Sequence, residues 1–260
     1  MSRRRADSLL AERGLAPSRS AAAQSVRAGR VRLPDGRRVQ KPSELLDEAA
    51  ELILEEGRRF VSRGGIKLEN ALEALPVAVE GRDCLDVGAS AGGFTDCLLR
   101  RGASRVIALD VGHGQLDFSL RRDPRVTVLE RSNARDLRPE LLPYAPELIT
   151  ADASFISLSK LLGPIADSAG ERFDLLALVK PQFELGPDRV GAGGVVRDAE
   201  DRRDALRAVA GAASERGLVV RGFAASGLPG PKGNRETFIW CSSSGTGVSD
   251  LEPAIVEVEP

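Results

Sequence analysis

Four charged side chains stand at positions where a charge calls for a chemical explanation. Lys67 lies in SRGGIKL, Asp152 ends the run ITAD, Lys180 follows LALV, and Glu236 precedes TFIW. A lysine or a carboxylate at the end of an apolar run is either an ordinary strand-end charge or a group that binds a ligand and moves protons. For one residue alone both interpretations are open, whereas the four together favour a catalytic site.

A glycine-rich turn, DVGASAGGF, follows the apolar run CLDV and has three interpretations. Its spacing does not fit the Gly-x-Gly-x-x-Gly pattern of dinucleotide-binding proteins. Residues 88–92 do fit Gly-x-Ser-x-Gly, the nucleophile turn of α/β-hydrolases, but in that fold the histidine comes late, after the acidic residue. The single histidine, His113, comes only 23 residues after Ser90, which argues against a hydrolase.

The third interpretation is a loop that binds S-adenosylmethionine. Small residues let the backbone approach the ligand, and exposed amides at a helix start favour its carboxylate. A carboxylate ending the next strand can accept both ribose hydroxyls, and the segment after the third strand usually contacts adenine. For the glycines alone, a plain turn stays open. The predicted cofactor-binding residues are Asp86, Gly88, Ala89, Ser90, Gly92, Gly93, Phe94, Asp110, Asn133, Ala134 and Asp152.

Alternating apolar runs and helical patterns must position these residues. We predict strands over 84–87, 105–110, 125–130, 147–152, 173–179, 218–224 and 237–241, with helical segments between them. This alternation predicts an α/β fold, an open and mainly parallel Rossmann-like sheet with helices on both faces, whose last two strands could form an antiparallel hairpin. The carboxyl ends of parallel strands line the ligand crevice, which places Asp152 and Lys180 beside the cofactor.

The net charge of −1 conceals two oppositely charged parts. Residues 1–42 hold eleven basic and three acidic residues, so the remainder is acidic. The front segment shows two short helix patterns and then a hairpin signal at Pro34-Asp35-Gly36, and this order resembles an S4-like α+β RNA-binding domain. A solvated charged surface is the alternative. The predicted RNA-binding residues are Arg4, Arg5, Arg19, Arg27, Arg30, Arg32, Arg37, Arg38 and Lys41.

We divide the chain into an S4-like domain over 1–57, a linker over 58–61, a catalytic domain over 62–241 and a poorly ordered tail over 242–260. The tail begins SSSGTG and then turns acidic, a composition typical of disorder. Three scattered cysteines fit a reducing cytoplasm, and one histidine leaves no His-rich metal site. No apolar run approaches the length of a membrane span, and the start lacks the core of a secretory signal.

Eight motifs in one order resemble the TlyA family, 2′-O-ribose methyltransferases of ribosomal RNA that are also called haemolysins. The motifs span most of residues 1–241 and include SRGGIKL, CLDVGASAGGFT, DVGHGQL, LERSNAR, ADASFISL, LVKPQFE, GAGGVV and LPGPKGN. The catalytic half is similar to FtsJ-type methyltransferases with a class I fold. One departure is Phe60, where some relatives carry tryptophan.

The resemblance implies the activity, the cofactor and the partner. The Lys-Asp-Lys-Glu tetrad of the FtsJ type corresponds to Lys67, Asp152, Lys180 and Glu236, the cofactor is S-adenosylmethionine, and the target is cytidine in ribosomal RNA within ribosomal subunits. We expect Lys180 to be the base: burial and a neighbouring Lys67 favour its neutral form, whereas Asp152 and Glu236 orient the lysines and act on their pKa in the opposite direction, which leaves the balance open. Phe155 and Phe183 are candidates for packing the target nucleoside, with core packing as the alternative. The segment GPDRVGAGGVVRD has the composition of a mobile flap.

Three other functions compete with methyl transfer. A membrane-active cytolysin would need an apolar span or an amphipathic basic helix with aromatic anchors, and neither is present in the sequence. A pseudouridine synthase would not need the glycine turn or Asp110. An RNA-binding protein without methyl transfer would not need all four tetrad positions filled.

Overall fold

The computed structural model describes residues 3–27, 29–55 and 59–260. These residues form two compact units, Met1–Arg59 and Phe60–Pro260. The predicted linker spans 58–61, and its first residue lies outside the described residues. The predicted α/β class is confirmed by a mainly parallel sheet in the second unit.

The first unit is a small α+β domain. It is built from β1 (Arg3–Arg5), α1 (Ala6–Glu12), α2 (Arg19–Arg27), β2 (Val31–Arg32), β3 (Leu45–Asp47) and β4 (Ile53–Leu54). Strand β1 pairs with β3 and β2 with β4, both antiparallel. The predicted hairpin around Gly36 is reduced to a single bridge between Arg32 and Arg38, because β2 takes β4 as its regular partner. Apolar side chains from both helices and from the strands form the core, among them Leu9, Leu10, Val26, Val31 and Leu46.

The second unit is a seven-stranded sheet with the strand order β10-β11-β9-β8-β5-β6-β7. Its strands are β5 (Asp83–Val87), β6 (Arg105–Asp110), β7 (Val126–Glu130), β8 (Leu148–Ala151), β9 (Asp174–Val179), β10 (Val219–Ala225) and β11 (Thr237–Ser242). Only β11 runs antiparallel to its neighbours, which are β9 and β10. The predicted pairing of the last two strands is therefore confirmed, with β11 inside the sheet and β10 at its edge.

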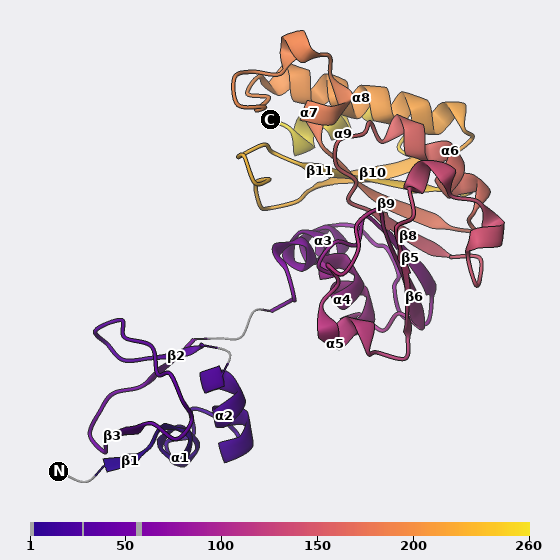
Figure 1. Cartoon of the computed structure of the whole chain (residues 1–260). Helices are drawn as coiled ribbons and strands as arrows, with labels where there is room; N and C mark the ends of the chain where they lie inside the picture. Colours follow the sequence, from indigo (N-terminus) through magenta and orange to yellow (C-terminus); the bar gives the residue numbers. More distant parts are fainter. Residues whose placement is uncertain (1–2, 28, 56–58) are drawn as a thin grey trace. The chain divides into compact units, whose positions relative to one another are not determined.

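Helices cover both faces of this sheet (Figure 1). On one face α3 (Arg63–Ala74), α4 (Gly93–Arg100) and α5 (Phe118–Arg121) supply the apolar side chains of one core cluster. On the other face α6 (Ser159–Asp167), α8 (Ala199–Glu215) and α9 (Leu251–Val258) supply the second. The shorter helices are η1 (Ala134–Asp136), η2 (Pro139–Leu141), α7 (Pro181–Glu184) and η3 (Pro187–Arg189).

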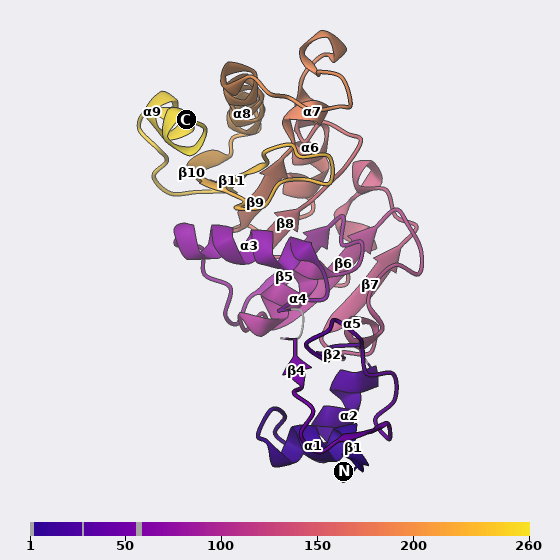
Figure 2. The same ribbon diagram turned by 90° about the vertical axis from the view of Figure 1, so that its left-hand side faces the viewer.

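The expectation of a poorly ordered tail after residue 241 was wrong. Residues 251–258 form α9, which packs beside α8 and β10 (Figure 2). Ile255 is fully buried in the core, and Glu259 is 3% exposed. Composition suggested disorder, but Leu251, Ile255 and Val258 recur at helical spacing and join the core.

Candidate active site

The sheet brings the four predicted catalytic side chains together at one edge. Asp152 follows β8 and Lys180 follows β9, two parallel neighbours, so both leave the sheet at its carboxyl edge. Glu236 precedes β11, and Thr237 pairs with Val179, so the reversed strand begins where β9 ends. Glu236, at the start of an antiparallel strand, therefore lies at the same edge as Asp152 and Lys180, at the ends of parallel strands.

Two lysine–carboxylate pairs form within this group. Lys180 Nζ lies 2.5 Å from Asp152 Oδ1 and donates a hydrogen bond to Ser154 Oγ over 2.8 Å. Lys67 pairs with Glu236. Both lysines and Glu236 are buried, while the Asp152 side chain remains 25% exposed. A buried lysine needs a counter-charge, so each amine is held in place by its carboxylate.

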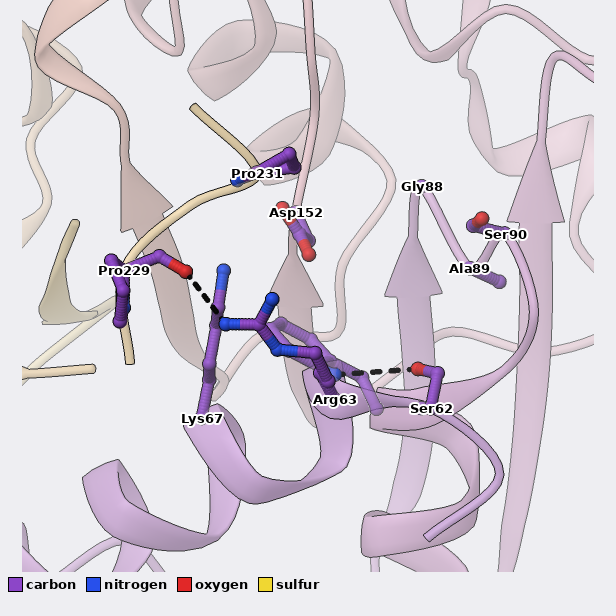
Figure 3. A pocket seen from close by; sticks show the side chains of 12 residues that line it. Ser62, Arg63, Lys67, Gly88, Ala89, Ser90, Asp152, Pro229 and Pro231 are labelled. Carbon is purple, nitrogen blue, oxygen red and sulfur yellow. Dashed lines mark hydrogen bonds between the residues drawn. The ribbon is translucent and has the colours of Figure 1, made fainter. Parts of the chain in front are cut away.

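Helix α3 carries Lys67 to this edge because its first turn packs tightly on the start of α4. Ser62 caps α3 by accepting a hydrogen bond from the Gly64 amide. A Cβ on Gly93 would lie 2.2 Å from Ser62 Oγ and 2.7 Å from the Gly65 nitrogen. Only glycine permits this approach, so the glycines of SRGG and AGGF fix the position of α3. Figure 3 shows Lys67 extending from α3 toward the Pro229–Pro231 loop and Asp152.

A cavity of about 170 Å³ lies over these groups. Lys67, Asp152, Gly88, Ser90 and Phe94 line it, together with the loop around Pro229 and Pro231. Arg63 closes one side by donating a hydrogen bond to the Pro229 carbonyl oxygen over 3.0 Å (Figure 3). The cavity therefore offers a small space beside Lys67 and Asp152, whereas Lys180 and Glu236 do not line it.

A larger cavity of about 550 Å³ adjoins it. It includes Gly88, Ser90, Asp110, Asn133 and Ala134 among the predicted cofactor residues. Asp110 accepts hydrogen bonds from the Ser90 amide over 2.7 Å and from the Gly112 amide over 2.6 Å, so the carboxylate is fixed at the rim. The volume is within the range of small-molecule sites, about 300–1,000 Å³. Asp152 lines this cavity as well as the smaller one.

Other predicted cofactor residues lie outside the larger cavity. Ala89, Gly93 and Phe94 line the smaller one, and Gly92 lines neither. Asp86 is fully buried beneath the loop, where its carboxylate accepts hydrogen bonds from the Thr95 amide over 2.9 Å and the Thr95 hydroxyl over 2.7 Å. Its expected contact with the cofactor is therefore corrected: Asp86 supports the loop. Burial, opposed by these hydrogen bonds, raises the pKa of Asp86 to about 7.

Phe155 is 90% exposed, which rules out core packing for this residue. Its backbone has φ = 63°, a left-handed conformation that costs energy for a phenylalanine. The ring lies 5.3 Å from that of the half-buried Phe183 and borders the larger cavity. The two predicted aromatic residues thus form a pair beside the cavities, with one ring free to contact another molecule.

The predicted flap is tied to the catalytic loop. Asn234, which is 2% exposed, accepts a hydrogen bond from the Val196 amide over 2.9 Å and donates one to the Gly194 carbonyl oxygen over 2.7 Å. Asn234 is two residues before Glu236. Any displacement of the flap therefore acts on the segment that positions the glutamate.

The predicted RNA-binding residues of the first unit differ in their partners. Arg4, Arg5, Arg19, Arg32 and Arg37 pair with nearby carboxylates. Arg30 donates a hydrogen bond to Ser25 Oγ. Arg27, Arg38 and Lys41 have no carboxylate partner among residues 3–27, 29–55 and 59–260. These three cations are free to neutralise phosphates without first breaking an ion pair.

Several residues at the site were missed by the sequence analysis. Ser154 hydrogen-bonds to Lys180, Arg63 borders the smaller cavity, and Gln115 and Ser132 border the larger one. Ser154 lies two residues after Asp152, a predicted catalytic residue. This closeness in the sequence could have identified Ser154 as part of the site. Gln115 and Ser132 lie on turns after strands, where nothing in the pattern distinguishes them from ordinary loop residues.

The described part of the chain brings no three metal-ligating side chains together. It also contains no helix with both the length and the apolar character that crossing a membrane requires. His113 is exposed and lies 2.8 Å from Glu130 Oε2, outside both catalytic cavities.

A mainly parallel seven-stranded sheet with one reversed strand, a glycine-rich first turn and a carboxylate ending the second strand define a class I methyltransferase. Residues 60–243 match the FtsJ-like methyltransferase family, and residues 4–52 match the S4 domain. The chain belongs to the TlyA family of FtsJ-like methyltransferases.

Similar proteins agree with this assignment. The 16S/23S rRNA (cytidine-2′-O)-methyltransferase TlyA of Mycobacterium tuberculosis is 51% identical over 92% of this chain and 89% of its own length. Hemolysin A of Brachyspira hyodysenteriae is 37% identical over 89% of this chain and 97% of its own. The solved structure of a Streptococcus thermophilus protein, described as a candidate hemolysin, is 38% identical, with a TM-score of 0.75 over 99% of this chain and 94% of that one.

Proposed function

We propose that the protein transfers a methyl group from S-adenosylmethionine to the 2′-hydroxyl of a cytidine in ribosomal RNA, within a ribosomal subunit. The observation that carries this proposal is the position of Asp152, which lines both the larger cavity and the smaller one and pairs with Lys180. A cofactor in one cavity and a hydroxyl in the other would meet at this residue.

The residues around the larger cavity fit S-adenosylmethionine. Asp110 offers a fixed carboxylate to ribose hydroxyls, and the turn at Gly88–Ser90 exposes backbone toward the cavity. Asn133 and Ala134 supply the opposite wall, where an adenine ring would lie. When bound, the cofactor supplies an electrophilic methyl group on its sulfonium sulfur.

The chain's own residues then position the hydroxyl and take its proton. The 2′-hydroxyl would lie in the smaller cavity beside Asp152, and Lys180, whose Nζ is paired with that carboxylate, is the candidate to accept its proton. Asp152, 2.5 Å from the same nitrogen, stabilises the ammonium that results. The Lys67–Glu236 pair closes the other side and orients the ribose.

The RNA partner follows from the first unit and from the relatives. The S4 domain carries basic residues that can bind phosphates, and the Mycobacterium tuberculosis relative is named for cytidines of ribosomal RNA. A nucleotide inside folded RNA must turn out of its stack to reach a 2′-O-methyl transfer site, and the exposed Phe155 ring offers it a surface.

One experiment tests the proposal directly. The protein is incubated with purified ribosomal subunits or intact ribosomes and S-adenosylmethionine labelled on its methyl group, and methylated riboses are mapped. We expect label on a cytidine 2′-oxygen. Absence of label from both subunits and from intact ribosomes would overturn the proposed function, and label on a base would overturn the assigned acceptor atom.

A further inference from the structure

The C-terminal helix ends in a buried ion pair close to the catalytic edge. Glu259 is 3% exposed and Arg202 of α8 is 6% exposed. Arg202 Nε donates a hydrogen bond to Glu259 Oε2 over 2.8 Å. A buried ion pair contributes little to net stability compared with apolar packing, so its presence calls for another explanation.

The second oxygen of Glu259 reaches the catalytic strand. Thr237 Oγ1 donates a hydrogen bond to Glu259 Oε1 over 2.7 Å, and Thr237 directly follows Glu236. The two glutamates line the same cavity of about 210 Å³ behind the Ser226–Pro229 loop. Glu259 therefore holds the residue next to the carboxylate that pairs with Lys67.

Arg202 extends the network to the flap. Its Nη1 donates a hydrogen bond to the Arg197 carbonyl oxygen over 2.7 Å, at the end of the flap segment. Arg203 Nε donates a hydrogen bond to the backbone carbonyl oxygen of Glu259 over 2.8 Å, which fixes the backbone of that residue. One buried charge pair thus joins α8, α9, the flap and the first residue of β11.

We propose that Glu259 and Arg202 are positioning residues for methyl transfer, acting on Glu236 through the Thr237 hydroxyl. This inference rests on the proposed function. The side chain of Glu236 has little lateral freedom, because its Oε1 lies 2.4 Å from where a Cβ on Gly230 would be. A shift at Thr237 is therefore passed on to Glu236 and to the Lys67 amine that it holds.

The mildest test removes only the hydroxyl. Thr237→Val keeps the shape of the side chain and leaves the Arg202–Glu259 pair in place. Glu259→Gln keeps an oxygen that can accept from Thr237 and removes the charge facing Arg202. For Thr237→Val we expect kcat to fall about tenfold, because displacements of 1 Å at a reacting centre cost up to about a hundredfold. A smaller fall is expected for Glu259→Gln.

Two readouts separate positioning from general damage. The Kd for S-adenosylmethionine should stay within about twofold of wild type, because the larger cavity is built from residues 87–161. The KM for the ribosomal subunit should also change less than kcat. All assays are run at a temperature where circular dichroism shows each variant folded.

Two controls lie on the same helix. Glu257→Gln changes an exposed glutamate and should leave kcat unchanged. Ile255→Val trims the fully buried side chain of α9 without touching the network, so it reports what destabilisation alone does. Wild-type kcat in both folded Thr237→Val and folded Glu259→Gln would overturn the inference, and so would a loss matched by Ile255→Val at equal melting temperature. Failure of the wild-type protein to transfer methyl groups would instead overturn the proposed function.

Discussion

Lys180 Nζ lies 2.5 Å from Asp152 Oδ1, and Asp152 lines both adjoining cavities, as do Gly88 and Ser90. The proposed base lines neither cavity itself but contacts a residue that lines both. This contact makes Lys180 the first residue to test.

Lys180→Ala should abolish methyl transfer and leave cofactor binding intact. Lys180 does not line the larger cavity, which includes Asp110 and Asn133. Removal of its amine should therefore leave this cavity intact. Labelled-methyl transfer measures the first effect and calorimetric titration with S-adenosylmethionine the second. The exposed Lys160→Ala serves as a matched control. Full activity of Lys180→Ala would refute the assignment of the base.

Asp110→Asn should weaken S-adenosylmethionine binding by about tenfold or more. The substitution removes the charge and turns one acceptor oxygen into a donor, and a lost hydrogen bond to a charged group costs about 1.5–3 kcal/mol. Isothermal titration measures the Kd. An unchanged Kd would show that Asp110 only supports the Ser90 and Gly112 amides, to which it is already bonded.

Phe155→Ala should raise the KM for the ribosomal substrate and leave the melting temperature nearly unchanged. The ring is 90% exposed, so its removal leaves no cavity in the core. Stacking of a base on an aromatic ring contributes about 1–3 kcal/mol, which predicts an effect of about fivefold to 150-fold. Steady-state kinetics and thermal unfolding give the two values, and a large loss of stability with unchanged KM would contradict this role.

Stability should depend on pH through Asp86. Its pKa is about 7 in the folded protein against an ordinary value of 3.8, so the folded state binds a proton more tightly than the unfolded state. The free energy of unfolding should therefore decrease as pH rises from about 4 to 7, by up to about 1.4 kcal/mol per pH unit from this group, and level off above. Urea unfolding at pH 5 and pH 7.5 measures the change.

Asp86→Asn provides the comparison for this pH effect. The amide oxygen can still accept from Thr95, and the side chain no longer has a charge to bury. The variant should lose most of the decrease between pH 5 and pH 7.5. An identical slope in the two proteins would show that other groups cause the pH dependence.

A chain beginning at Arg59 should bind S-adenosylmethionine but lose most of its affinity for ribosomal subunits. The second unit begins at Phe60, a residue buried in its core, so the shortened chain has to include this residue. Calorimetry and filter binding measure the two affinities. Retained affinity for the subunits would show that the second unit alone holds the RNA.

The fold could be predicted because its strands are short apolar runs separated by amphipathic helices. The tetrad follows from the resemblance to FtsJ-type methyltransferases, and the positions of Asp152 and Lys180 at the carboxyl edge follow from the parallel strands that precede them. Those positions follow from the order of the elements and need no knowledge of side-chain contacts.

The corrections concern contacts between distant parts of the chain. Asp86 has the residue type and position of a ligand-binding carboxylate, but its depth depends on how Thr95 and Thr150 close over it. Glu259 lies in an acidic segment, and its partner Arg202 is 57 residues away in the sequence. No periodic pattern in the neighbouring sequence predicts that the side chain of Asp86 or of Glu259 is buried. Their burial is seen only in the folded chain.

The late position of β11 in the sequence also sets the order in which the site is assembled during synthesis. The S4 domain leaves the ribosome first, and the residues of the cofactor cavity are complete once Leu161 has been made. Glu236 and the strand that carries it come near the end, and Glu259 later still. In a nascent chain, Lys67 would therefore meet Glu236 only after the last strand has entered the sheet.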